Sequence, residues 1–242
     1  MQCILDVYTV SESPCQLSLY FSRNVSCFQI VVAVECGDME RESENGLRPT
    51  LWRTARALAN AERLALLRAA VVSGGTTDVA RLAEAAGLAR STASGYLRML
   101  NARGLLAVDR RDGRVFYGPG TDRSLPVAAA VQQSFVRYVR KPDLPRDWIE
   151  RTLPSIRAFS HFRRLALLED LVRNPGLPQQ DLAARSRLCA PVFALHFGTL
   201  LRSGFVRAEP DGSVSLLRPP PPFATILLAT LRKGLDSPSP AA

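Results

Sequence analysis

The spacing of apolar residues in the middle of the chain predicts the turn and second helix of a helix-turn-helix. Ala93, Leu97 and Leu100 fall at positions i, i+4 and i+7, which places them on one face of a helix. Gly87 precedes this helix and is the residue type that ends a helix in a left-handed turn. The opposite face carries short polar and cationic side chains, which are Arg90, Ser91, Thr92, Ser94 and Arg98. Such groups reach phosphates and base edges, so we expect this face to meet a nucleic acid duplex.

The flanking pattern completes the order of a winged helix. Upstream, apolar stripes predict two helices that meet at an N-cap, Asn60, and then a short helix over Val79–Ala86. Downstream, a strand is followed by a two-residue turn at Asp112-Gly113 and by a returning strand, Val115–Tyr117. Helices, turn, helix and hairpin in this order predict a winged helix.

The same pattern recurs about 100 residues later. Arg63-Leu-Ala-Leu-Leu67 recurs as Arg164-Leu-Ala-Leu-Leu168, and Asp112-Gly113 recurs as Asp211-Gly212. We therefore expect a mainly α fold with small β-hairpin wings, built as tandem winged helix-turn-helix domains.

The two copies differ where they would meet DNA. In place of the polar helix the second copy has Ala190-Pro-Val-Phe-Ala-Leu-His-Phe-Gly198, without an arginine or a hydroxyl group. Its extra apolar residues, Val192, Phe193 and Leu195, favour packing against protein or around a small ligand. The second copy is thus expected to be degenerate and to serve dimerisation or effector response.

Composition and turn residues divide the chain into five parts. We expect an N-terminal extension over 1–46, a winged helix DNA-binding domain over 47–120, a helical connector over 121–157, a degenerate second winged helix domain over 158–220, and a C-terminal helix and tail over 221–242. Composition changes abruptly at Met39, so residues 1–38 are interpreted as the product of a misplaced start codon or as a disordered segment. The connector contains an amphipathic helix over Leu125–Arg140, whose stripe either packs on its own domain or forms a dimer seam.

Charge adds modest support for a polyanionic partner. The chain carries 31 Lys and Arg against 22 Asp and Glu, a net charge of +9, and residues 57–120 hold nine arginines against five acids. A run of ~18 apolar residues is missing, as is the basic start of a secretory signal. We therefore expect a cytoplasmic protein that does not insert in a membrane.

Residues 51–117 resemble the ArsR-type winged-helix repressors of bacteria and archaea. The resemblance rests on Leu58–Leu67, Leu82–Leu88, Ser91–Ser94, Leu97–Leu100, Gly104–Leu106 and Arg110–Tyr117. It implies that the helix from Ser91 lies in the major groove and that the hairpin tip near Asp112 touches the flanking minor groove or backbone. The DNA-binding residues it implies are Arg90, Ser91, Thr92, Ser94, Tyr96, Arg98, Arg110, Arg111 and Arg114. Ala89, where the family often has a serine cap, and Gly95, where a polar or basic side chain is common, depart from the family pattern.

Other site chemistry is not expected from the sequence. The cysteine or Asp/His pairs of the family's metal sites are missing, and His161 and His196 lack partners at ligand spacing, so no metal or cofactor is predicted. Neither a phosphate-binding glycine loop nor a nucleophile elbow is present, so we expect no catalytic residues and no enzyme.

The sequence thus favours a DNA-binding transcription regulator, a repressor, with double-stranded DNA, a second copy of itself and a small-molecule effector as partners. The alternative is a winged-helix protein-protein interaction module that does not bind DNA. The arginines on one face, Arg90 and Arg98 with those of the wing, favour the first function.

Overall fold

The computed structural model describes most of the chain from residue 48 onward and three short segments before it. The described residues are 7–10, 15–21, 30–36, 48–122, 124–217 and 222–236. The early segments are the strands β1 (Val7–Val10), β2 (Cys15–Phe21) and β3 (Ile30–Cys36), which pair antiparallel in the order β1-β2-β3. The interpretation of residues 1–38 as an upstream extension stays a prediction, and residues 237–242 of the expected tail lie outside the described residues.

A first set of elements follows the order expected for a winged helix. It consists of α1 (Arg48–Leu58), α2 (Ala61–Val72), β4 (Thr77–Asp78), α3 (Val79–Ala85), α4 (Arg90–Ala102), β5 (Ala107–Arg111), β6 (Arg114–Gly118) and α5 (Pro126–Val139). The sequence pattern located these helices and both long strands but missed β4. Thr77 was expected at the end of a loop, with Thr77 or Asp78 as the cap of the next helix. Both residues also pair with β6, opposite Tyr117 and Phe116, and make the wing three-stranded.

Local chemistry explains where the helices begin. Asn60 accepts the backbone N–H of Arg63 on its side-chain oxygen at 2.9 Å, which confirms the predicted cap of α2. Asp78 caps α3 in the same way through the N–H of Arg81 at 3.0 Å. These two caps fix the residues at which α2 and α3 begin.

A second set of elements repeats the order of the first. It consists of α6 (Trp148–Phe159), α7 (Phe162–Arg173), α8 (Gln179–Ser186), α9 (Ala190–Leu201), β7 (Val206–Ala208), β8 (Val214–Leu216) and α10 (Pro222–Asp236). The isolated bridge between Pro178 and Ser213 takes the place of the β4–β6 pairing. Helix α6 thus precedes α7 as α1 precedes α2. Helix α10 follows the second hairpin as α5 follows the first.

One arginine of the repeated sequence makes the same contact in both sets of elements. Arg63 donates from its guanidinium to the carbonyl of Arg56 at 3.1 Å, at the C-terminal end of α1. Arg164 donates in the same way to the carbonyl of Arg157 at 3.1 Å, at the end of α6. The last carbonyls of a helix have no hydrogen-bond partner within it, and a cation near them interacts favourably with the negative end of the helix dipole. Burial lowers the pKa of Arg164 to about 10, which leaves it charged at neutral pH.

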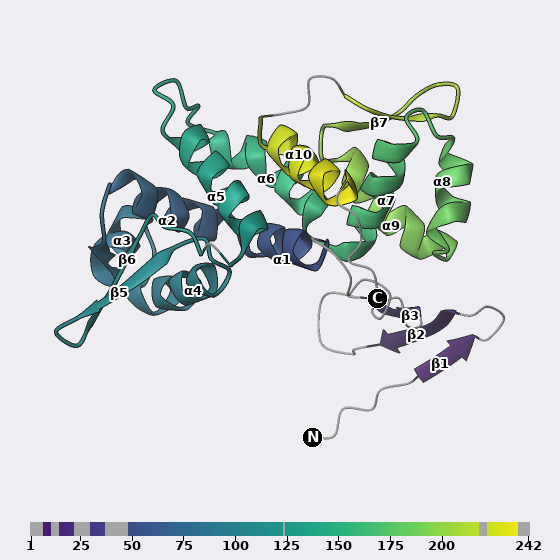
Figure 1. Cartoon of the computed structure of the whole chain (residues 1–242). Helices are drawn as coiled ribbons and strands as arrows, with labels where there is room; N and C mark the ends of the chain where they lie inside the picture. Colours follow the sequence, from purple (N-terminus) through teal and green to yellow (C-terminus); the bar gives the residue numbers. More distant parts are fainter. Residues whose placement is uncertain are drawn as a thin grey trace.

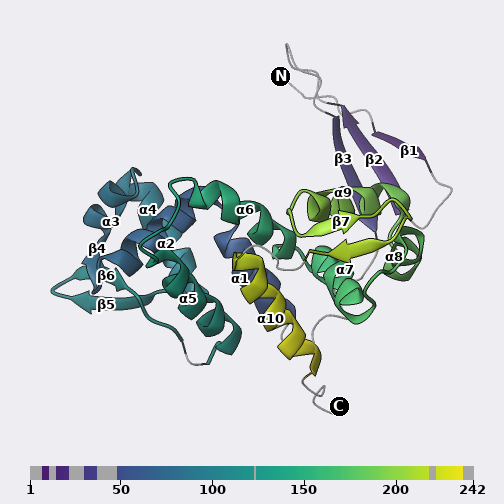
Figure 2. The same cartoon turned by 90° about the horizontal axis from the view of Figure 1, so that it is seen from above.

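The two sets share one core in the middle of the molecule. Helices α1 and α5 of the first set pack against α6 and α10 of the second. Figures 1 and 2 show these four helices between two lobes, one formed by α2–α4 with β4–β6 and the other by α7–α9 with β7 and β8. Phe135 of α5 is fully buried, with its ring centroid 6.0 Å from that of Trp148 in α6 and 6.0 Å from that of Phe223 in α10. Such edge contacts between aromatic rings join the two halves of the chain.

The apolar stripe of the predicted connector helix packs within the shared core. The helix expected over Leu125–Arg140 is α5, and its Val127, Val131 and Phe135 are buried inside the chain. This stripe is therefore covered by α10 and by helices of the first set. Whether residues 121–157 form a separate connector domain stays a prediction.

Candidate nucleic-acid interface

The turn between α3 and α4 sets the direction of the exposed helix. Gly87 has a φ of +66°, which confirms the predicted left-handed turn. The N–H of Leu88 donates to the carbonyl of Ala83 at 2.9 Å, and that of Gly87 to Glu84 at 3.0 Å. These two bonds form a Schellman motif, which ends α3 and directs the chain into α4.

The inner face of α4 is fixed by the predicted apolar stripe. Ala93, Leu97 and Leu100 are fully buried, and α4 packs against α2 and α3. The stripe therefore determines which side of α4 faces outward.

The outer face of α4 carries the predicted polar and cationic groups. Arg90, Ser91, Thr92 and Arg98 are exposed, whereas Ser94 is half-buried. The guanidinium of Arg98 lies along the helix and donates to the carbonyl of Ser94 at 3.4 Å. Within residues 48–122, neither Arg90 nor Arg98 forms an ion pair. Both cations remain available to a phosphate.

The first turn of α4 is open to an anion. Ala89 is the N-cap residue and provides no side-chain acceptor, and Ser91 does not substitute for it. The backbone N–H groups at this end have no partner within the helix, and they lie beside Arg90. Open N–H groups and the positive end of the helix dipole favour phosphate at this position.

Tyr96 lies one helical turn after Thr92, and its side chain contacts the start of α2. Its ring is stacked under the guanidinium of Arg63, with 5.5 Å between the guanidinium carbon and the ring centroid. A hydrogen bond to Glu62 raises the pKa of the Tyr96 hydroxyl. The expected contact of Tyr96 with DNA stays a prediction, while the contacts observed attach α4 to the start of α2.

The wing has the turn and the cations that the sequence predicts. Asp112 and Gly113 have φ values of +50° and +72°, and Arg111 pairs with Arg114 across the turn, as a type I′ hairpin requires. Arg110, Arg111 and Arg114 are exposed. Arg111 forms an ion pair with Asp109, so this carboxylate offsets part of its charge. Figure 1 shows the hairpin in the same lobe as α4, with its tip projecting from the end of the molecule.

The corresponding surface of the second set has a different character. Val192 and Phe193 of α9 are buried, and α9 packs against α6, α7 and α8. Leu195 is 65 % exposed. The additional apolar residues of α9 are thus mostly covered by protein, which is one of the two outcomes that the sequence favoured.

His161 and His196, which were predicted to lack partners at ligand spacing, lie in contact. The ring of His161, which caps α7 by accepting the N–H of Arg163, has its centroid 4.4 Å from that of His196 in α9. Burial, followed by repulsion from neighbouring cations, lowers the pKa of His161 to about 3 and that of His196 to about 4. The described residues contain no group of three or more side chains suited to a metal ion.

Alignment of the two repeats in the sequence could have predicted this contact. Asn60 and Tyr96 of the first set stand where His161 and His196 stand in the second, and Tyr96 also reaches the start of the helix that Asn60 caps. A side chain at this position of α4 or α9 is therefore expected to approach the start of α2 or α7, respectively.

Comparison with protein families identifies the class of the first lobe. Residues 64–110 match the model of the IclR helix-turn-helix domain, which spans most of α2 through β5. This match supports a winged helix-turn-helix of a DNA-binding transcription regulator. No curated protein matches the chain. None of the helices in the described part of the chain combines the length and apolar character needed to span a bilayer.

Comparison with solved structures returns human N-acetylserotonin methyltransferase in complex with SAM. The match has 17% sequence identity and a TM-score of 0.32, and it covers 69% of this chain and 44% of the methyltransferase chain. The matched protein is an enzyme, which contradicts the expectation from missing motifs that this chain is not one. At this TM-score the likeness carries no argument about the reaction, the cofactor or the fold of this chain.

Proposed function

We propose that this chain is a transcriptional repressor that docks its first lobe on double-stranded DNA. In this proposal α4 lies in the major groove and the β5–β6 hairpin contacts the flanking backbone. The observation that supports it best is the set of exposed cations on one lobe. These are Arg90 and Arg98 on α4 with Arg110 and Arg114 on the wing, none of which is in an ion pair within residues 48–122. Genomic DNA as the target agrees with the cytoplasmic location expected from the sequence.

The second lobe is proposed to be a degenerate winged helix with a supporting role. Its order of elements repeats that of the first lobe, but α9 offers neither an arginine nor an exposed hydroxyl group in its first two turns. The proposed relationship of the first lobe to the ArsR type rests on the sequence motifs between residues 51 and 117. Together these features favour one DNA-contacting lobe in each chain.

We further propose that two chains bind together. A single recognition helix makes few base contacts, and paired helices about one turn of DNA apart are the usual solution. The stripe of α5 is covered within the chain, so the contact between two chains involves another surface. Sedimentation of the protein with and without DNA tests this, because a 1:1 complex at saturation would contradict it.

The DNA proposal is tested with duplexes enriched from a random pool by the wild-type protein. Arg98→Ala combined with Arg110→Ala should weaken binding at least tenfold at low salt, because two phosphate-directed cations are lost. The slope of log affinity against log salt should fall by about two. Fluorescence anisotropy across a salt series measures both quantities.

The matched control is Arg207→Ala, which removes an exposed arginine from β7 in the wing of the second lobe. It should leave affinity and salt slope unchanged. The DNA proposal fails if the wild type enriches no duplex or if the double variant binds like the control. Either result would favour the alternative function, a protein-protein interaction module.

A further inference from the structure

A cavity of about 550 Å³ lies where the two halves of the chain meet. Its walls come from the end of α5, the loop after it, the first half of α6, the turn between α9 and β7, and the start of α10. Small-molecule sites fall in the range of about 300–1,000 Å³, so this cavity is large enough for a metabolite. A molecule bound there would touch both sets of elements at once.

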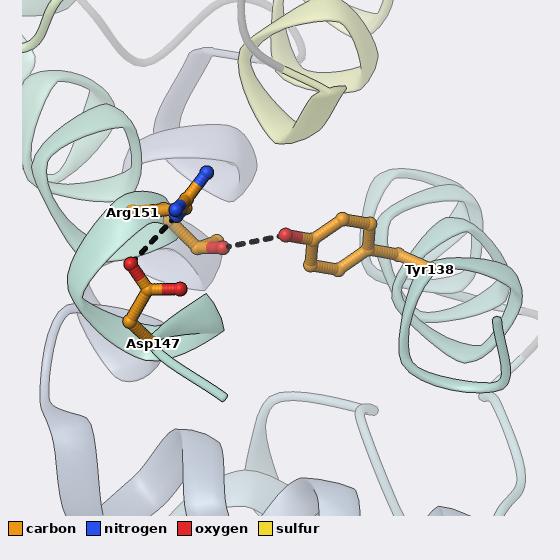
Figure 3. Close-up of polar contacts among 4 residues, drawn as sticks. Tyr138, Asp147 and Arg151 are labelled. Carbon is orange, nitrogen blue, oxygen red and sulfur yellow. Dashed lines mark hydrogen bonds and ion pairs between the residues drawn. The ribbon is translucent and has the colours of Figure 1, made fainter. Parts of the chain in front are cut away.

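Two aromatic rings contribute to the apolar part of the wall. Tyr138 of α5 and Phe223 of α10 line the cavity with their ring centroids 6.3 Å apart. Figure 3 shows Tyr138 extending from α5 toward α6, where its hydroxyl accepts a hydrogen bond from Thr152 at 3.3 Å. An aromatic guest can pack beside these two rings.

Unused hydrogen-bonding groups also line the cavity. The Ser155 side chain of α6 is 1% exposed, and its hydroxyl has no hydrogen-bond partner. Pro154 has no N–H, so the carbonyl of Glu150 lacks its usual donor within α6. A buried polar group without a hydrogen-bond partner costs free energy. To satisfy the Ser155 hydroxyl and the Glu150 carbonyl, a ligand group must be able both to donate and to accept a hydrogen bond. A ligand hydroxyl supplies both.

The rim does not select for net charge. Arg151 donates to Asp147 at 2.7 Å (Figure 3), so these two charges offset each other. The other charged groups lining the cavity are two cations and two carboxylates, which are Lys141, Arg202, Asp143 and Glu150. Equal numbers of opposite charges favour a neutral ligand.

We propose that this cavity binds a neutral aromatic molecule that carries a hydroxyl group, with that hydroxyl directed at Ser155. This inference rests on the proposed DNA-binding function, for which it supplies the effector site. A mechanical link to the DNA-binding lobe is present: Arg140, between Tyr138 and Lys141 in the chain, donates to the carbonyl of Val71 at 3.3 Å. Val71 lies in the last turn of α2, against which α4 packs. A ligand that shifts the end of α5 therefore acts on the support of α4.

Binding is tested on the full chain without DNA, with 4-ethylphenol as the probe and 4-ethylanisole as a probe whose hydroxyl is blocked. Saturation-transfer NMR and titration of tryptophan fluorescence report binding, since Trp148 packs against Tyr138 with 6.5 Å between ring centroids. The phenol should bind about tenfold more tightly than the ether, because only the phenol can donate a hydrogen bond to the buried Ser155 hydroxyl, which has no partner.

The variant Ser155→Ala should reduce this preference severalfold and remain folded, because it removes a hydroxyl that makes no bond. The control Thr230→Ala, in α10 and outside the cavity wall, should bind both probes like the wild type. Absence of saturable phenol binding, equal affinity for the two probes, or an unchanged preference in Ser155→Ala would each overturn the site.

Coupling to DNA is a separate measurement. Saturating 4-ethylphenol should change the affinity for DNA severalfold, and Arg140→Met should abolish this change while it retains phenol binding. Phenol binding without any effect on DNA affinity would refute the effector role. Failure of the protein to bind DNA at all would refute the proposed function and leave the result of the binding experiment standing.

Discussion

Positions 87 and 187 build the same turn from different residues. Gly87 has a φ of +66° before α4, and Arg187 has a φ of +53° before α9. A left-handed backbone costs a residue with a side chain roughly 1–2 kcal/mol, whereas glycine adopts it freely. The second lobe therefore retains the left-handed residue of the turn without a glycine. There the N–H of Leu188 donates to the Ser186 hydroxyl at 3.3 Å, whereas the N–H of Leu88 donates to a helix carbonyl.

The two contacting histidines should make stability depend on pH. Their folded pKa values, about 3 for His161 and about 4 for His196, lie below the value of 6.5 expected in the unfolded chain. Between these values the unfolded state binds more protons, so the stabilisation is complete above pH 6.5 and is lost as pH falls toward 4. Unfolding free energy should drop by at most about 1 kcal/mol per histidine between pH 7 and 5.5, and by less for the half-exposed His161.

Thermal melts of the wild type and of a double variant, His161→Asn with His196→Gln, measure this effect. Asparagine is the cap at the matching position of the first lobe, so it preserves the start of α7. The variant should show a shallower loss of melting temperature with acidification. Equal slopes in the two proteins would rule out the histidines as the cause.

At the scale of the element, α4 combines a well-packed inner face with a weak position on its outer side. Gly95 lies in the middle of this helix, one turn after Ser91, and an added Cβ would meet no atom within 4 Å. Glycine inside a helix is less favourable than alanine by about 1 kcal/mol. The residue is therefore not required by packing within the chain.

Gly95→Ala should accordingly raise the free energy of unfolding by up to about 1 kcal/mol. Urea denaturation followed by circular dichroism checks this value. The control Gly113→Ala should shift stability in the opposite direction, because Gly113 has a φ of +72° in the wing turn. A loss of stability in Gly95→Ala would mean that α4 is not the regular helix described above.

At the scale of the whole molecule, the two lobes depend on a core that neither completes alone. The buried apolar residues form one cluster that extends from Leu51 in α1 to Leu231 in α10. Each half of the chain contributes two helices to the middle of this cluster. We therefore expect the lobes to unfold together.

Phe135→Ala tests this expectation at the centre of the core. The loss of a fully buried phenylalanine should cost about 3–5 kcal/mol and should destabilise both lobes. Tryptophan fluorescence, which reports on α1 and α6, and circular dichroism, which reports on all helices, should give coincident urea transitions. Val72→Ala, at a side chain that is 57% exposed, should change stability by less than about 0.5 kcal/mol. Separate transitions by the two probes would disprove the shared core.

The sequence by itself determined the features that depend on neighbouring residues. The caps at Asn60 and Asp78, the left-handed turn at Gly87, the stripe of α4 and the hairpin turn at Asp112-Gly113 all follow from short-range spacing and backbone preference. The exposure of Arg90 and Arg98 follows from the same stripe, because the stripe determines which side of α4 faces outward.

Only the tertiary structure decided which segments that lie far apart in the sequence meet in space. The pairing of α1 with α6 and of α5 with α10, the contact of His161 with His196, and the cavity beside Ser155 depend on how helix faces fit together in space. An apolar stripe specifies that a face is buried but not its partner, because hydrophobic attraction is non-directional and shape complementarity makes the choice.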